Sequence, residues 1–236
     1  MPEAPEKRPE FDAYARDYAA LLHDPIREKF APGSRFFFER KLQIICDFHR
    51  RLKVDTHQLR WLDVGCGRGD LLRLGRPLFA SSVGCDLSQG MLEFCRDLEV
   101  RQQPSFNRIP WNDAAFDFVT AVCVFHHAAG AERTALASEM LRVVRPGGLV
   151  CVIEHNPFNP VTRWVVSRTP VDADAKLLRA RQTRRLLAST GASILRTRYF
   201  LYFPERTYRR LGRIEDSLAR IPIGGQYAVF GARNPR

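Results

Sequence analysis

The sequence predicts an α/β fold with a doubly wound, mostly parallel sheet. From Arg60 onward, short β-prone runs alternate with helical patterns, which is typical of parallel strands joined by crossover helices. Before Arg60 the apolar residues recur at helical spacing. The chain has 236 residues, of which 45% are hydrophobic, enough for one domain with a real core. We therefore expect a Rossmann-like, seven-stranded sheet with an N-terminal helical cap.

Two helices are expected ahead of the sheet. Apolar residues repeat every three to four positions over 11–31, and this helix is expected to stop around Asp24-Pro25 and Pro32-Gly33. A second helix is expected from Ser34, as its N-cap, to Leu52. The first helix presents one apolar face, made by Phe11, Tyr14, Tyr18, Leu21 and Leu22.

Six of the seven strands can be placed from the sequence. Strands are expected at about 60–64, 82–86, 116–123, 149–154, 193–202 and 226–232. Helices are expected near 69–80, 88–98, 131–144, 178–190 and 205–220. The third of these helices ends at Arg145-Pro146-Gly147-Gly148, because proline cannot continue a helix and glycine permits the turn. Residues 155–175 are expected to form a polar, proline-bearing loop.

The charge balance is strongly basic, with a formal net charge of +11. This charge indicates an acidic substrate, a nucleic acid or an anionic lipid as partner, or simply a solvated helix face. Charge alone therefore assigns no partner. Arginines are dense in the last third of the chain: Arg179, Arg181, Arg184, Arg185, Arg206, Arg209, Arg210 and Arg213.

The cysteines and the N-terminus indicate a reducing compartment. None of the six cysteines forms a C-x-x-C pair, and most stand in apolar runs, which is typical of small buried side chains. No apolar stretch approaches the ~20 residues needed to cross a bilayer. The first residues, MPEAPEKRPE, lack the apolar core of a secretory signal. We expect a cytoplasmic protein without a transmembrane segment.

A glycine-rich turn after the strand at 60–64 is the most informative stretch. Gly65, Gly67 and Gly69 alternate with other residues and lead directly into a helix. Glycine lets a ligand approach bare backbone, and a helix N-terminus attracts anionic groups. Asp86 ends the next strand, 17 residues after Gly69, placed to accept hydrogen bonds from a ribose diol.

The spacing within this turn distinguishes two nucleotide-like ligands. A dinucleotide site requires G-x-G-x-x-G, whereas here Gly69 is followed by Asp70, whose carboxylate would repel a pyrophosphate. Asp63, at the start of the motif, is also not a feature of nicotinamide folds. The turn therefore favours an adenosyl ligand over a dinucleotide.

With these motifs the chain resembles the class I S-adenosylmethionine-dependent methyltransferases. It is similar to the type 11-like, small-molecule group that includes the ubiquinone and menaquinone methyltransferases. The resemblance is strong over about 60–155 and specific for cofactor and fold, but says little about substrate. The matching segments, in order, are 61–69, 83–92, 109–117 and 141–148.

The resemblance implies S-adenosylmethionine as cofactor and S-adenosylhomocysteine as product. It places the ribose on Asp86 and the adenine against Met91. An aspartate that usually accepts from the adenine amino group is replaced by Ser105, a neutral and weaker acceptor. The full set of implied cofactor-binding residues is Tyr18, Asp63, Gly65, Gly67, Gly69, Asp86, Leu87, Met91, Ser105, Phe106 and Cys123.

The resemblance also implies a domain layout. We expect a disordered tail over 1–10 and a single methyltransferase domain over 11–236. Within it, 11–55 is the helical cap, 56–155 the cofactor-binding core, and 156–236 the substrate loop with the C-terminal part of the sheet.

Three histidines are the candidate catalytic residues. The fourth strand ends at His126 and His127, and the fifth at Glu154 and His155, so these side chains should converge where neighbouring parallel strands end. An oxygen or nitrogen nucleophile that starts protonated needs a base, and an ordinary imidazole has a pKa near ~6.5. Alternatively, the histidines pack on the cofactor or cap the next helix. We expect no metal, because adjacent histidines cannot easily both face one ion.

Substrate selection is assigned to the N-terminal helices and to the 155–175 loop. The aromatic side chains there are lid or pocket candidates, although they equally suit the apolar faces of two packed helices. These aromatic residues are Tyr14, Tyr18, Phe36, Phe37 and Phe38.

Three functions remain open from the sequence. The leading interpretation is methylation of a small-molecule acceptor at oxygen or carbon. The basic C-terminal helix favours an RNA or tRNA methyltransferase instead, although no RNA-binding module is recognisable. The third is a catalytically silent protein that binds S-adenosylmethionine. The acceptor and the oligomeric state are not determined by the sequence.

Overall fold

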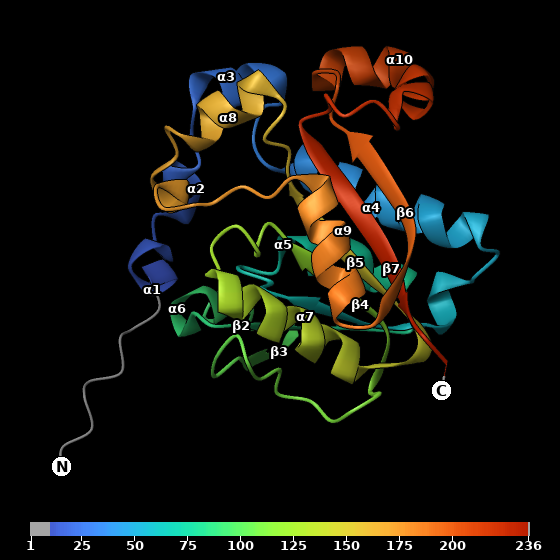
Figure 1. The fold of residues 1–236 in the computed structure, drawn as a ribbon. Coiled ribbons are helices and arrows are strands. Elements are labelled where there is room, and N and C mark those ends of the chain that lie inside the picture. The colour runs from blue at the N-terminus through green and yellow to red at the C-terminus, as the bar shows by residue number, and fades with distance from the viewer. Residues whose placement is uncertain (1–9, 236) are drawn as a thin grey trace.

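The sheet has the strand order β3-β2-β1-β4-β5-β7-β6 in the computed structural model, which describes residues 10–235 (Figure 1). All neighbouring strands are parallel except β7, which runs antiparallel to β5 and β6. The predicted seven-stranded, mostly parallel sheet is confirmed. The strands are β1 Arg60–Val64, β2 Ser81–Asp86, β3 Glu99–Gln102, β4 Phe116–Val122, β5 Val144–His155, β6 Ala192–Phe200 and β7 Gln226–Arg233.

Helices cover both faces of the sheet and the edge where the parallel strands end (Figure 1). The α-helices are α1 Glu10–Tyr14, α2 Tyr18–Leu21, α3 Pro25–Phe30, α4 Arg35–Arg51, α5 Asp70–Gly75, α6 Gln89–Leu92, α7 Gly130–Val143, α8 Pro160–Val166, α9 Ala180–Ser189 and α10 Glu205–Leu218. Within residues 10–235, no helix is long and apolar enough to cross a membrane.

Two apolar cores hold the helices to the sheet, because successive side chains of a strand point to opposite faces. In β4, Val119 and Ala121 pack in a cluster with α7 and α9. Phe118 belongs to the other cluster, which contains Ile44 and Ile45 of α4. All these side chains are fully buried. The central strands are thus apolar on both faces, as a sandwiched parallel sheet requires.

For the first predicted helix, over 11–31, the expected stop at Asp24-Pro25 is confirmed, but the break between α1 and α2 at 15–17 was not expected. The structure divides it into α1, α2 and α3. The Asp24 carboxylate accepts hydrogen bonds from the backbone N–H groups of Ile26 and Arg27, at 2.8 and 3.1 Å, and Pro25 occupies the first turn of α3. Capping and proline both start a new helix here. The expected tail over 1–10 lies outside the described residues, apart from Glu10 in α1.

The helix before β5 ends at Val143, close to the predicted 144, but the residues after it differ from the expectation. Strand β5 begins at Val144, directly after α7, and contains the Pro-Gly-Gly run that was expected to form a turn. The pairing with β4 shifts between Phe116 and Phe118, so this run forms a bulge. Gly147 has a φ of +74° there, a conformation that favours glycine.

Three other expectations are adjusted for local reasons. The helix expected at 69–80 ends at Gly75, before Pro77, and continues as a 3-10 turn over Arg76–Leu78. The helix expected at 88–98 covers only Gln89–Leu92. Strand β3 was not placed from the sequence, because as a mostly exposed edge strand it lacks apolar alternation.

The region 155–175 is not only a loop, because it contains α8 and a 3-10 turn over Pro170–Asp172. The Asn159 side chain caps α8 by accepting from the Thr162 N–H at 2.8 Å. An ion pair of 3.7 Å between Arg168 and Asp24 joins this region to α3. Figure 1 shows α8 beside α3, so the cap is built from both halves of the chain.

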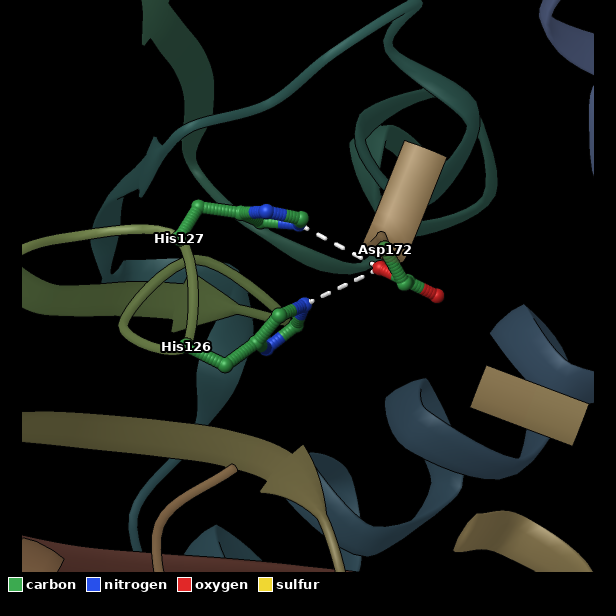
Figure 2. A group of neighbouring side chains, drawn as sticks. All are labelled: His126, His127 and Asp172. Atoms are coloured by element: carbon green, nitrogen blue, oxygen red, sulfur yellow. Dashed lines mark ion pairs between the residues drawn. The ribbon is translucent and has the colours of Figure 1, made fainter. Parts of the chain in front are cut away.

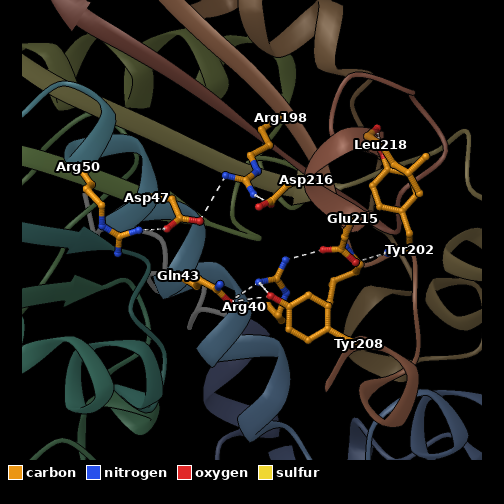
Figure 3. A network of polar contacts seen from close by, with 11 residues as sticks. Arg40, Gln43, Asp47, Arg50, Arg198, Tyr202, Tyr208, Glu215, Asp216 and Leu218 are labelled. Atoms are coloured by element: carbon orange, nitrogen blue, oxygen red, sulfur yellow. Dashed lines mark hydrogen bonds and ion pairs between the residues drawn. The ribbon is translucent and has the colours of Figure 1, made fainter. Parts of the chain in front are cut away.

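A buried ion pair joins α4 to α10 (Figure 3). The Arg40 and Glu215 side chains are each 2% exposed, and Nη2 of Arg40 contacts Oε1 of Glu215. Arg40 also donates to the Tyr208 hydroxyl at 2.5 Å. Glu215 further accepts from the backbone N–H of Tyr202, at 3.0 Å. This pair holds α10 and the residues just after β6 against α4.

We predict that Glu215→Ala destabilises the protein strongly, by about 3–5 kcal/mol, because it leaves the Arg40 guanidinium buried without its partner. Urea unfolding followed by circular dichroism measures this. Glu205→Ala, which breaks the Arg209–Glu205 ion pair at the surface, is the control and should have almost no effect. Equal unfolding midpoints for the two variants would contradict the assigned role of the buried pair.

Candidate functional site

The glycine turn after β1 leaves one stretch of backbone open to a ligand. A Cβ atom on Gly65 would lie 2.4 Å from Val124, and one on Gly69 would lie 2.4 Å from Leu98. A Cβ on Gly67 would meet no atom within 4 Å. All three glycines have positive φ. Gly65 and Gly69 therefore serve packing, whereas Gly67 borders free space.

Asp86 stands beside this open backbone at the end of β2. Its carboxylate accepts from the N–H groups of Gly67 and Ser88, at 2.8 and 2.9 Å. Burial raises the pKa of Asp86. Asp12 of α1 lies next to it and accepts from the Ser88 hydroxyl and the Gly90 N–H. Asp12 was not predicted, because nothing in the pattern of an amphipathic helix shows that one carboxylate contacts another element.

Asp63 is a buried carboxyl group at the centre of the sheet. It accepts a hydrogen bond from the Thr120 hydroxyl at 2.6 Å. Burial raises the pKa of Asp63 to about 7, an effect that the hydrogen bond and the positive charge of Lys41 oppose. Asp63 is thus poised to ionise beside a cation.

Lys41 of α4 is a buried cation that was not predicted as a site residue. Its Nζ lies 4.9 Å from the centroid of the Phe38 ring, and it forms no ion pair with any residue from 10 to 235. A lysine on the apolar face of a helix, between Phe38 and Leu42, was the available signal. A buried ammonium group without a counter-ion favours an anionic ligand group.

The residues expected to contact adenine differ in their burial and partners. Ser105 is exposed, and its hydroxyl accepts from the Asn107 N–H at 3.3 Å. The buried polar side chain of this loop is Gln103, which donates to the Ser105 carbonyl at 2.8 Å. Phe106 packs against the apolar core. Met91 is buried in α6, and Leu87 is half-buried beside Asp86.

A cavity of about 420 Å³ lies between the carboxyl ends of the strands and the helical cap. Its walls are mainly apolar and include Ile26 of α3 and Val165 of α8. Tyr18, Phe37 and Phe38 line it, whereas Phe36 is buried in the core and Tyr14 is outside the lining. Polar groups gather on its inner side: Tyr18, Lys41, Cys123, His126, His127, His155 and Asp172.

Two predicted cofactor residues, Tyr18 and Cys123, face this cavity. Burial, together with the charge of Asp172, raises the pKa of the Tyr18 hydroxyl, so the phenol stays protonated. Cys123 directly follows β4 with a φ of +58°, and burial raises the pKa of its thiol as well. Neither group is a base at neutral pH.

The three candidate histidines do converge. The ring centroids of His126 and His127 are 4.0 Å apart, and those of His126 and His155 are 5.3 Å apart. Glu154 lies fully buried beneath them and accepts from the backbone N–H groups of Val124 and Phe125, at 3.0 and 2.8 Å. The Glu154 carboxylate lies 2.5 Å from His126 Nδ1. This contact orients the His126 ring.

The surroundings move all three imidazoles away from the expected pKa near ~6.5. Burial lowers the pKa of His126, but the carboxylates of Glu154 and Asp172 outweigh it and raise the value to about 10. Burial, followed by the charge of His126, lowers the pKa of His127 and of His155 to about 4. At neutral pH, His126 is therefore charged and the other two rings are neutral.

Asp172 completes the cluster from the turn after α8 (Figure 2). Its Oδ1 lies 3.4 Å from the Nε2 atoms of both His126 and His127. The expectation that adjacent histidines cannot easily both face one ion is therefore wrong, because the turn after β4 places both Nε2 atoms near the same carboxylate oxygen. No sequence spacing connects Asp172 with these histidines, so only the folded cap reveals it.

Comparison with known proteins places the same elements in a family. Residues 62–152 match the family model described as a methyltransferase domain. A tRNA (carboxymethyluridine(34)-5-O)-methyltransferase of Macaca fascicularis is 37% identical over 91 residues, 36% of this chain and 13% of that protein. A ubiquinone/menaquinone biosynthesis C-methyltransferase of Geobacter sulfurreducens is 36% identical over 110 residues, 41% of this chain and 42% of that protein.

The similarity of fold extends further than the similarity of sequence. A SAM-dependent methyltransferase from Thermotoga maritima superposes with a TM-score of 0.67 at 15% identity, over 95% of this chain and 98% of that one. The matches to the two curated relatives span less than half of each relative's length. The family model itself covers the chain from β1 into β5, including the glycine turn.

We predict that the Asp63 carboxyl group makes the protein less stable as pH rises. Its pKa of about 7 in the folded chain exceeds the ~3.9 of an unfolded aspartate. The stability due to the protonated form is present below pH ~4 and lost as pH rises through about 7. Asp63→Asn should therefore gain stability relative to wild type between pH 5 and 8. Urea unfolding of both proteins without added ligand, at pH 5 and at pH 8, measures this. An equal difference in unfolding free energy between the two proteins at both pH values would contradict the prediction.

Proposed function

Because the chain contains a class I S-adenosylmethionine-dependent methyltransferase domain, we propose that it methylates a small molecule with an apolar body, at oxygen or carbon. One observation carries the proposal: the apolar cavity of about 420 Å³ that opens onto the strand ends and the histidine cluster. Ligand pockets of enzymes are concave, mostly apolar and equipped with a few polar groups, and this cavity has that character.

The cofactor is proposed to lie along the glycine turn. Its ribose hydroxyls would donate to Asp86, and the bare backbone at Gly67 would border the ligand. At the methionine end, the ammonium group would pair with the buried carboxylate of Asp63, and the carboxylate would pair with the buried ammonium group of Lys41. The sulfonium methyl would then point toward the cavity.

The acceptor is proposed to bind under the helical cap. Ile26, Phe30 and Val165 would cover its apolar part and exclude water, which favours in-line attack on the methyl carbon. The acceptor lone pair forms the new bond to carbon while the C–S electron pair returns to sulfur. His155 is the imidazole proposed to take a hydroxyl proton, because it lines the cavity, is neutral at pH 7 and contacts the amide of Gln226, at 3.4 Å.

A tRNA acceptor is the second candidate. It is favoured by the tRNA methyltransferases among the relatives and by the net charge of +11. The arginines of α9 and α10 that carry much of this charge are exposed, as phosphate contacts would need to be. Against it, the walls of the cavity are apolar, and a flipped nucleotide would bring its charged backbone against Ile26 and Val161.

We predict that Gly67→Val abolishes binding of S-adenosylhomocysteine while the protein stays folded. The added side chain enters free space, so it excludes ligand without displacing other residues. Gly147→Val is the matched control, because Gly147 also has positive φ but lies in the bulge of β5. Isothermal titration calorimetry measures both. Normal binding by Gly67→Val, or equal losses in the two variants, would refute the proposed cofactor position.

The acceptor class is tested by filling the cavity. Val165→Trp should block turnover of apolar hydroxylated small molecules yet leave S-adenosylhomocysteine binding intact, because Val165 lines the cavity whereas no residue of the glycine turn does. Ile214→Trp, at an exposed site on α10, is the control. The readout is S-adenosylhomocysteine formation over a panel of acceptors and bulk tRNA. Turnover of tRNA that survives Val165→Trp and falls steeply with salt would establish the second candidate instead.

A further inference from the structure

We propose that His126, His127 and Asp172 bind a divalent metal ion of the zinc type, whose open side faces the cavity. The proposed ligand atoms are the two Nε2 atoms and Oδ1 of Asp172. The metal site itself is independent of the proposed function. Its suggested role, holding an acceptor oxygen, rests on that function.

The spacing of the three atoms fits a tetrahedral metal site. With metal–ligand bonds of about 2.0–2.1 Å, tetrahedral ligand atoms lie roughly 3.3–3.4 Å apart. Both Nε2 atoms lie 3.4 Å from Oδ1 of Asp172, and all three ligand atoms lie within 4.8 Å of one another (Figure 2). A separation of 3.4 Å exceeds that of a good N–H···O hydrogen bond. An ion between the three atoms would satisfy all of them.

The Nε2 atom of His126 supports this assignment. It is buried and has no hydrogen-bond partner among the described residues, although it points into the cluster. Burying such a polar atom without a partner is costly. A metal ion would displace the Nε2 proton of the charged His126 ring and take up the nitrogen lone pair, so binding would release a proton and remove that cost.

Glu154 supplies the outer support that metal-binding histidines have. Such histidines usually offer their second ring nitrogen to a carboxylate, which fixes the ring and leaves the first nitrogen for the metal. Glu154 contacts Nδ1 of His126 at 2.5 Å and is itself held by two backbone N–H groups. The His126 ring is therefore oriented before any ion binds.

Three protein ligands leave one position of a tetrahedral ion open, as in catalytic zinc sites. Here the three ligand residues also line the cavity, beside Tyr18 and His155. An acceptor hydroxyl bound there would lose its proton to solvent or to His155, because the metal lowers its pKa. The oxygen lone pair then attacks the methyl carbon, and the C–S electron pair leaves with sulfur. The reaction needs no reactant besides the acceptor, the methyl donor and the group that takes the proton.

The same ion would fasten the cap to the sheet. Asp172 belongs to the turn after α8, whereas His126 and His127 follow β4. A ligand that binds only the folded arrangement stabilises it by mass action. Metal binding should thus raise the melting temperature as well as organise the cavity.

The test titrates tag-free, chelator-treated protein with Co²⁺, whose visible absorption reports tetrahedral ligands, and then displaces it with Zn²⁺. We expect saturable binding of one ion per chain and a higher melting temperature with Zn²⁺. Glu154→Gln should weaken binding about 10- to 100-fold. Asp172→Asn and His127→Gln, which remove ligands, should weaken it more. His57→Gln, at an exposed histidine outside the cluster, is the matched control and should bind normally.

Circular dichroism and S-adenosylhomocysteine calorimetry check that each variant is folded. Absence of saturable Co²⁺ binding by the wild type, or equal binding by Asp172→Asn and His57→Gln, would overturn the metal site. Because this titration needs no acceptor, it separates the two proposals. Saturable binding with no effect of Zn²⁺ or chelator on small-molecule turnover would keep the site and reject its role in methyl transfer.

Discussion

The candidate site depends on one buried carboxylate, that of Glu154. It accepts hydrogen bonds from the backbone N–H groups of Val124 and Phe125 and contacts His126. Those N–H groups belong to the turn that leaves β4, while Glu154 itself belongs to β5. A carboxylate without these partners could not stay fully buried. The buried Glu154 carboxylate therefore holds the ends of β4 and β5 in one geometry, and this geometry positions the histidines.

Polar contacts act together with apolar packing to attach the helical cap to this base. Asp12 binds the start of α6, Asp172 meets the two histidines, and Arg40 pairs with Glu215 across α4 and α10. Buried pairs of this kind add little net stability, but removing one partner is costly. They thus specify one position for helices whose apolar faces alone would tolerate several. A cap positioned in this way keeps a cavity open beneath it instead of collapsing onto the sheet.

The sequence predicted best what local rules determine. Strand β1 was predicted from its apolar run, and the glycine turn because positive φ there favours glycine. The histidine cluster was predicted because neighbouring parallel strands end at the same edge of the sheet. Asp172, Lys41 and Asp12 were missed because their roles depend on how the cap folds over that edge. The pKa values of the histidines were missed for the same reason. Burial and neighbouring charges determine them, and neither can be read from residue spacing.

The apolar walls of the cavity bear directly on the proposed reaction. Attack by an oxygen anion on a sulfonium joins two opposite charges, and both disappear as the methyl group is transferred. Water stabilises the separated charges more than the transition state, so excluding water from the reacting atoms favours the reaction. In the proposed reaction Ile26 and Val165 would exclude water, although Arg27 of α3 also lines the cavity, as do Lys41 and Asp172. A metal ion at His126 and Asp172 would fit this arrangement, because it would hold the oxygen as an anion without bringing water to the methyl carbon.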